Sequence, residues 1–127
     1  MKTEFIPYEQ ALELKELGFD EKCLGYYHNI LGSTNANLFI KETSKELYSR
    51  IKIPEDSYTL APIYQQAFRW FREKYRLYPE IIYSARDKHW VCQWSDSIGF
   101  ELLGSYSTYE EAELACLKKL IEIAKNK

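Results

Sequence analysis

The spacing of apolar residues predicts three amphipathic helices in this chain. Between residues 64 and 78 the apolar positions follow steps of three and four, which is one stripe on a helix: Tyr64, Ala67, Phe68, Phe71, Tyr75 and Tyr78. A second line recurs every seven residues on the flank of this stripe, at Ile63, Trp70 and Leu77. The last helix also has two lines, formed by Tyr109, Ala112, Cys116, Leu120 and Ile123 and by Leu114, Leu117, Ile121 and Ala124. Both helices are therefore apolar over more than one face, and we place Phe68 and Phe71 in the core.

Three similar segments mark the starts of the helices, at residues 7–11, 62–67 and 108–112. The first two open with proline, which is favoured at the first helical position because its missing N–H costs nothing there. Before the third, Ser107 and Glu110 have the spacing of a capping box. The first helix is expected to end with Gly18 just beyond its C-cap.

Between the helices the apolar period changes to two, which indicates strands. Residues 47–53 alternate between apolar and basic positions and predict a half-buried strand ended by Pro54. Weaker strands are expected over 23–29 and 38–41, separated by a turn at 32–35. The segment 54–61 is expected to link the two halves of the chain.

In the second half, a two-residue turn at Asp87–Lys88 would pair Ala85 with Trp90, Tyr83 with Cys92 and Ile81 with Trp94 on one face. The opposite face of this hairpin would be mostly polar. A further strand is predicted over 100–106. The predicted fold is α+β with antiparallel pairing in the order α-βββ-α-βββ-α. We expect one domain over 1–127, with an internal duplication into halves of about 1–54 and 62–127.

Composition places the chain among ordinary globular proteins. Its 127 residues carry 17 basic and 19 acidic side chains, a formal net charge of −2. This balance argues against a strongly basic nucleic-acid binder, and the apolar runs are too short to span a membrane. The N-terminus has no apolar segment typical of a secretory signal, so a cytoplasmic location is expected.

No group of residues predicts a metal site or a catalytic centre. Zinc accepts all of the side chains at Cys23, His28, His89 and Cys92. Their separations of five and three residues place each pair on opposite faces of a strand, which argues against a shared metal. The odd number of cysteines, at 23, 92 and 116, favours buried free thiols. We therefore expect no cofactor and no enzymatic activity.

The candidate binding surface lies between residues 69 and 89. Residues 69–88 hold six basic and three acidic side chains, whereas 94–113 hold five acidic and no basic ones. Aromatic rings among the basic residues could stack on nucleic-acid bases, but most of these rings belong to the core stripe. Pairing between the basic and acidic segments is the rival interpretation. The candidate surface residues are Trp70, Arg69, Arg72, Arg76, Arg86 and His89.

Three runs of sequence resemble a known family. They are residues 7–12 with 16–21, 61–75 and 109–121, and they are similar to a family of small uncharacterised proteins carried by phages and mobile elements of gut Bacteroidales. The resemblance implies an accessory protein that acts in the bacterial cytoplasm. It supplies no catalytic or binding residues.

Two functional interpretations stay open at this point. A protein-interaction module, binding itself or a host protein, predicts an exposed flat apolar patch. A small-ligand binder for a nucleotide-like molecule predicts a concave pocket where an arginine and an aromatic ring converge. Self-association is expected through the second apolar lines of the two later helices, unless these helices pack side by side and cover each other's flanks.

Overall fold

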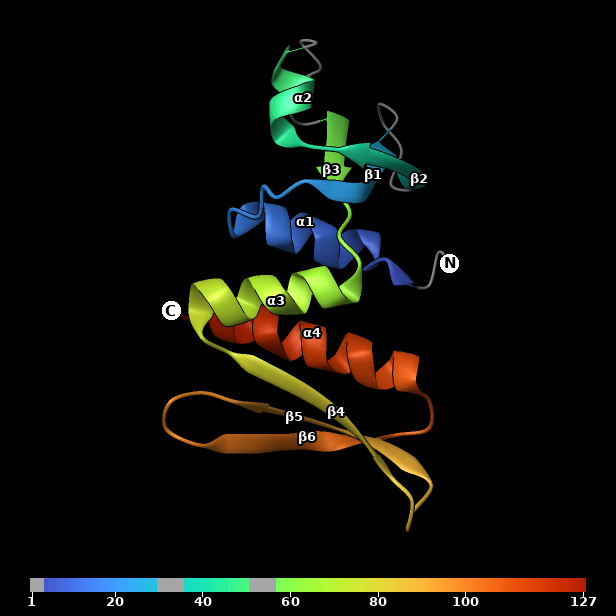
Figure 1. The fold of residues 1–127 in the computed structure, drawn as a ribbon, viewed down its shortest axis with the longest axis vertical. Coiled ribbons are helices and arrows are strands. Elements are labelled where there is room, and N and C mark those ends of the chain that lie inside the picture. Colours follow the sequence, from blue (N-terminus) through green and yellow to red (C-terminus); the bar gives the residue numbers. More distant parts are fainter. Residues whose placement is uncertain (1–3, 30–35, 51–56) are drawn as a thin grey trace. The chain divides into compact units, whose positions relative to one another are not determined.

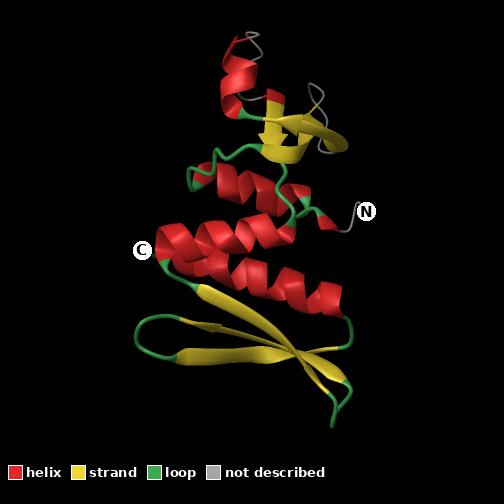
Figure 2. Cartoon of the chain, viewed as in Figure 1, coloured by secondary structure: helices red, strands yellow, loops and turns green. Residues whose placement is uncertain are grey.

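The computed structural model describes residues 4–29, 36–50 and 57–127 (Figure 1). Helices and strands alternate along the chain in the predicted α-βββ-α-βββ-α order, with one short additional helix (Figure 2). The elements are α1 (Tyr8–Glu16), β1 (Cys23–Asn29), β2 (Ala36–Thr43), α2 (Lys45–Arg50), β3 (Tyr58–Leu60), α3 (Tyr64–Tyr75), β4 (Tyr78–Ser84), β5 (His89–Ser95), β6 (Phe100–Tyr106) and α4 (Tyr109–Lys125). The α+β class and the antiparallel pairing are therefore confirmed.

Contacts divide the chain into two compact units, Met1–Ile63 and Tyr64–Lys127. We call them the N-terminal and the C-terminal unit. The boundary falls within the predicted start of the middle helix. The expectation of a single domain stays a prediction.

The N-terminal unit contains helix α1 and a sheet with the strand order β2-β1-β3. Pro7 is the N-cap of α1 rather than its first helical residue, because its ψ of 158° is extended. Gly18 follows the C-cap Leu17 with a φ of 97°, a left-handed conformation that suits glycine. The Phe19 N–H then donates to the Leu14 carbonyl at 2.9 Å, so the predicted end of this helix is confirmed.

Two predictions in this unit are wrong. The strand predicted over 47–53 is helical in its first part, α2, while residues 51–53 lie outside the described residues. The Ser44 hydroxyl accepts the Leu47 N–H at 3.1 Å, an N-cap contact that favours helix over the alternating pattern. The predicted link 54–61 contains strand β3, whose three residues are buried and pair with β1. The turn predicted at 32–35 lies outside the described residues.

The C-terminal unit contains the sheet β4-β5-β6 with α3 and α4 side by side on one face (Figure 1). The core positions Phe68 and Phe71 of α3 are confirmed, since they are 8% and 0% exposed. The predicted stripe extends too far, because α3 ends at Tyr75 and Tyr78 lies on β4, where it is 43% exposed. The flank lines are buried as well, at Trp70, Leu77, Leu117, Ile121 and Ala124. The reason given for self-association through these helix flanks is therefore wrong, because the chain itself covers them.

The β4–β5 hairpin differs from its predicted register by two residues. Trp90 pairs with Tyr83 rather than Ala85, and Cys92 pairs with Ile81 rather than Tyr83. The loop has four residues, Ala85 to Lys88, and only Lys88 in it adopts a positive φ. A tight two-residue turn of either common type would require a positive φ at Asp87. Since the shift is even, each side chain stays on its predicted face.

The cap of α4 lies one residue later than predicted. Thr108 is the N-cap, and its hydroxyl accepts the Glu111 N–H at 3.1 Å. Ser107 and Glu110 are not the capping pair, because the helix begins at Tyr109. The predicted strand over 100–106 matches β6, and the strand over 23–29 matches β1.

The two sheets share an element order but not a strand order. The first strand is central in the N-terminal unit, whereas the second strand is central in the C-terminal unit. The similarity of the halves is therefore limited to sequence and element order. Within the described part of the chain, every helix is too short or too polar to cross a membrane.

Candidate interaction surface

The predicted surface residues do not form one patch. Trp70 is only 6% exposed, with its ring 5.1 Å from Phe71 and 5.5 Å from Tyr75, so it offers no surface for stacking. The placement of Trp70 in the candidate surface is therefore wrong, because its ring packs against other side chains of α3. Lys74 Nζ lies 5.0 Å from the centre of the Trp70 ring and covers it from the solvent side.

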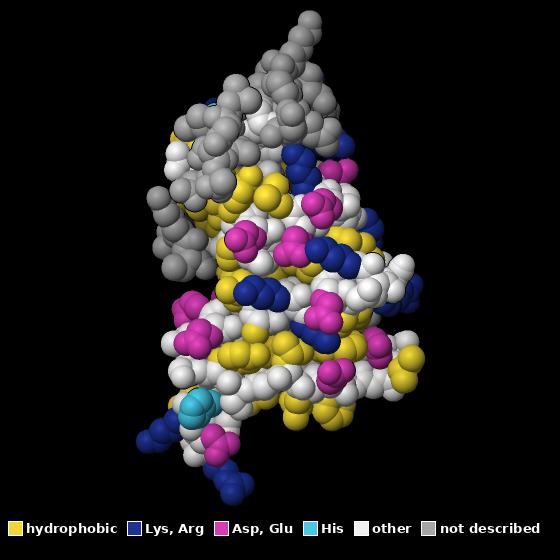
Figure 3. Space-filling view, turned by 180° about the vertical axis from the view of Figure 1, so that it is seen from behind, with side chains coloured by type: hydrophobic (Ala, Val, Ile, Leu, Met, Phe, Trp, Pro, Cys, Tyr) yellow, Lys and Arg dark blue, Asp and Glu magenta, His cyan; other side chains and the backbone are white. Residues whose placement is uncertain are grey.

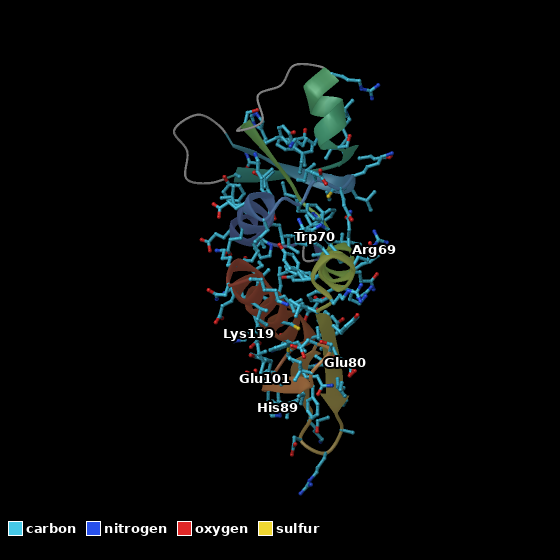
Figure 4. The ribbon with its side chains drawn as sticks, turned by 90° about the vertical axis from the view of Figure 1, so that its left-hand side faces the viewer. Arg69, Trp70, Glu80, His89, Glu101 and Lys119 are labelled. Carbon is cyan, nitrogen blue, oxygen red and sulfur yellow. The ribbon has the colours of Figure 1, made fainter. Side chains whose placement is uncertain are left out.

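The basic residues separate into two groups, and Figure 4 shows one member of each, Arg69 and His89, near opposite ends of strand β4. Arg69 and Arg72 are exposed on α3, and Arg76 is exposed just after it. Arg86 and His89 are exposed at the β4–β5 loop, on the other side of a strand of seven residues, which spans roughly 23 Å. A single ligand contacting both groups would have to bridge this distance.

Figure 3 shows basic and acidic side chains together at the tip of the β4–β5 hairpin, beside a histidine. His89 Nδ1 lies 2.6 Å from the Asp87 carbonyl oxygen, so the ring is held against its own loop. On α3, Arg69 Nε lies 3.9 Å from Glu73 Oε1. These local contacts are typical of a solvated charged surface.

The register of the sheet defines a different and more coherent surface. In antiparallel strands, directly paired residues share a face and alternate residues point to opposite faces. Cys92 points to the face covered by the helices, because it is fully buried and lies against Cys116 of α4. The opposite face, which we call the open sheet face, carries three rows: Ile82–Val91–Ser105, Glu80–Gln93–Leu102 and Tyr78–Ser95–Phe100.

The open sheet face is unusually apolar for a surface in contact with solvent. Phe100 is 70% exposed and Leu102 58% exposed, and Ile82 and Tyr78 follow at 44% and 43%. At roughly 200 Å² for a whole large apolar side chain, these four contribute about 400 Å² of exposed apolar surface. This area falls in the range of the largest patch on a typical monomer, about 300 to 600 Å², which is often functional.

The polar residues of this face are few and partly paired with one another. Gln93 Nε2 donates to Glu80 Oε1 at 2.9 Å, across the β4–β5 pair. Glu80 is the only acidic residue in the three rows, and no basic residue is among them. The centre of the face therefore combines apolar side chains with one hydrogen-bonded polar pair.

The β5–β6 turn extends the apolar surface beyond the sheet. Ile98 at its tip is 93% exposed. The turn is held by Asp96, whose carboxylate accepts the N–H groups of Ile98 and Gly99 at 2.8 and 3.1 Å. These two hydrogen bonds lower the pKa of Asp96, so the carboxylate stays charged and the turn stays closed at neutral pH.

The open sheet face was not predicted from the sequence, because the corresponding side of the β4–β5 hairpin was expected to be mostly polar. The hairpin alone contributes Tyr78 and Ile82 at one edge. Phe100 and Leu102 join them only when β6 is placed beside β5. The sequence contains one signal of this face, because Phe100 and Leu102 alternate with Glu101 in a predicted strand. The pairing of that strand with β5 was not predicted.

Two cavities among the described residues of the N-terminal unit are further candidate sites. One of about 60 Å³ lies between α1 and β3, where Lys15 Nζ donates to the Tyr58 carbonyl at 2.8 Å. The other, of about 290 Å³, is an apolar groove lined by Phe5, Leu24 and Ile40 among others. No arginine is among the described residues that line either cavity.

The cysteines are all buried, as predicted. Cys92 and Cys116 hydrogen-bond to each other, and this bond together with burial raises the pKa of Cys116 far above its usual range. Cys116 is thus a thiol at neutral pH and a poor nucleophile. Within the described ranges, no cluster of three or more His, Cys, Asp or Glu side chains could hold a metal ion.

Comparison of the chain with protein-family models, with curated proteins and with solved structures finds no match.

Proposed function

We propose that this chain is a non-enzymatic accessory protein of phage or mobile-element origin that acts in the bacterial cytoplasm by binding another protein. Its binding surface is the open sheet face of the C-terminal unit. The observation that carries the proposal is the exposure of Tyr78, Ile82, Phe100 and Leu102 on one face of the sheet. The origin and the location rest on the sequence resemblance alone.

The physical reason is the free-energy cost of exposing these apolar side chains to water. An antiparallel sheet with one solvated face normally places polar side chains there. Here large apolar residues occupy both edges of the face, and the only acidic residue among its rows is held by Gln93. Interface centres have the same character, since charged residues are depleted and aromatic residues enriched in them.

The cavities favour this function over the binding of a nucleotide-like ligand. Pockets for ligands of drug size usually have volumes of about 300 to 1,000 Å³ and contain a few convergent polar groups. The cavity beside Lys15 has about 60 Å³, which is too small, and the groove beside Leu24 is lined mainly by apolar side chains. Neither offers an arginine facing an aromatic ring.

Site-specific cross-linking in the bacterial cell tests the proposal. A photoreactive amino acid replaces Leu102 on the open sheet face, and in a matched control it replaces Arg72, which is exposed on α3. We expect covalent protein adducts from position 102 and few from position 72. Equal labelling from both positions, or no adduct from position 102, would contradict the proposed surface.

A further inference from the structure

We infer that the partner of the open sheet face is a second copy of this chain, so that two C-terminal units stack their sheets face to face. The inference rests on the proposed function, because it names the occupant of the proposed surface. Three observations carry it: the area of the face, its charge and its symmetry.

The area matches what a stable dimer needs. With Ile98 included, the exposed apolar side chains amount to about 600 Å². Two copies together would bury about 1,200 Å² of this apolar surface, which is the lower end of the range for a specific interface. A second copy presents a surface of the same area and the same apolar composition.

The low charge of the face permits it to pack against the same face of a second copy. A dimer with two-fold symmetry brings the same surface patch together from both copies, so a strongly charged patch would repel its own image. The three rows contain one acidic residue, Glu80, in the middle row and at the edge formed by β4. The remaining members of the rows are apolar or neutral.

The position of Glu80 selects the orientation. A two-fold axis that lies in the interface and runs across the strands would place β4 of one copy over β4 of the other. The two Glu80 carboxylates would then lie together. An axis parallel to β5 instead places β4 of one copy over β6 of the other. The two Glu80 side chains then lie at opposite edges, and Tyr78 packs on the second copy's Phe100. Two antiparallel sheets that pack with nearly aligned strands form a sandwich of the common type.

Sedimentation equilibrium of the full chain tests the association. The monomer mass is 15.1 kDa, so we expect a mass of about 30 kDa at protein concentrations near 100 µM. Leu102→Glu should return the mass to that of the monomer, with association weakened at least tenfold. Leu24→Glu is the matched control, because Leu24 is 55% exposed in the N-terminal unit and Leu102 is 58% exposed.

A wild-type mass that stays at the monomer value would overturn the inference. Dissociation by Leu24→Glu as complete as that by Leu102→Glu would also overturn it, because the association would then be non-specific. Thermal melts confirm that each variant is folded. A monomeric mass combined with adducts of other proteins from position 102 would leave the proposed function standing, so the two failures are distinguishable.

Disulfide formation between copies tests the orientation. Tyr78→Cys and Phe100→Cys chains are oxidised separately and as a mixture. Within one copy, Tyr78 and Phe100 lie two strand spacings apart, roughly 10 Å, which is too far for a disulfide. We expect covalent dimers mainly in the mixture, whereas dimers formed equally by either variant alone would overturn the parallel axis.

Discussion

Truncation of Phe71 should strongly destabilise the C-terminal unit. The side chain is fully buried on α3, with its ring 5.1 Å from Trp70 and 5.9 Å from Tyr75. Its carbonyl also accepts the Leu77 N–H at 3.3 Å, where the chain leaves the helix. Phe71→Ala removes the ring from the centre of the packing but leaves this backbone contact in place.

The expected loss follows from the area and the cavity. A phenylalanine side chain buries about 150 to 200 Å², and most of this is lost on truncation to alanine. At about 25 cal/mol per Å² the transfer contribution is about 3 kcal/mol. The ring contacts and the cavity add to this loss, which gives a total of about 3 to 5 kcal/mol, the usual range for buried phenylalanine.

Urea denaturation followed by tryptophan fluorescence is the suitable assay. The three tryptophans are Trp70, Trp90 and Trp94, so their emission reports on the C-terminal unit. With a denaturant slope of about 2 kcal/mol per molar, the transition midpoint should fall by about 2 M. Phe100→Ala is the matched control when the protein is diluted until sedimentation gives the monomer mass, because the same substitution at a side chain that is 70% exposed in the single chain should then cost less than about 1 kcal/mol.

The core assignment would be refuted by a loss below about 1 kcal/mol for Phe71→Ala. An equal loss for the two variants would show that the exposed fraction does not govern the cost. A changed slope with an unchanged midpoint would indicate an altered denatured state instead.

Three further predictions concern local contacts. Thr108→Ala should lower the free energy of unfolding by about 1 kcal/mol, because the Glu111 N–H loses its cap, and Thr108→Ser should retain most of it in the same urea assay. Cys92 and Cys116 should resist a thiol reagent at neutral pH in the native protein and react in urea, and rapid native labelling would contradict their burial. The contacts that lower the pKa of Asp96 stabilise the turn fully at pH values above the pKa of an unfolded aspartate, about 3.9. This stabilisation is lost as the pH falls through the lower pKa of the folded protein. Carboxyl NMR titration measures that pKa, and a value at or above the unfolded one would contradict the role of the turn.

The sequence predicted those elements whose hydrophobic period decides both their type and their burial. Helix α3 is such an element, whereas β6 was predicted as a strand although its apolar Phe100 and Leu102 are exposed. Helix α2 was missed because residues 47–53 alternate as in a strand, whereas the Ser44 hydroxyl caps a helix that begins at Lys45. The hairpin register depends on a loop conformation at Lys88 that single residues do not specify.

The candidate surface was harder to predict because it depends on which elements are neighbours. Trp70 follows an apolar line that would be exposed on an isolated helix, and only the folded chain shows that it is 6% exposed, with its ring against Phe71 and Tyr75. Phe100 and Leu102 are ordinary strand residues in sequence. They become a patch because β6 joins Tyr78 and Ile82 through the central strand β5.

The different strand orders of the two sheets have a consequence for folding kinetics. In the C-terminal unit each strand pairs with the next one along the chain, so the first contact, Ser84 with His89, closes a loop of only a few residues. In the N-terminal unit β1 must also pair with β3, and the contact of His28 with Tyr58 closes a loop of about thirty residues. The longer loop costs about 1.6 kcal/mol more in closure entropy, and non-local pairing of this kind slows folding. We therefore expect the C-terminal sheet to form first during refolding, before β3 completes the N-terminal sheet. This order is the reverse of the order in which the ribosome synthesises the two units.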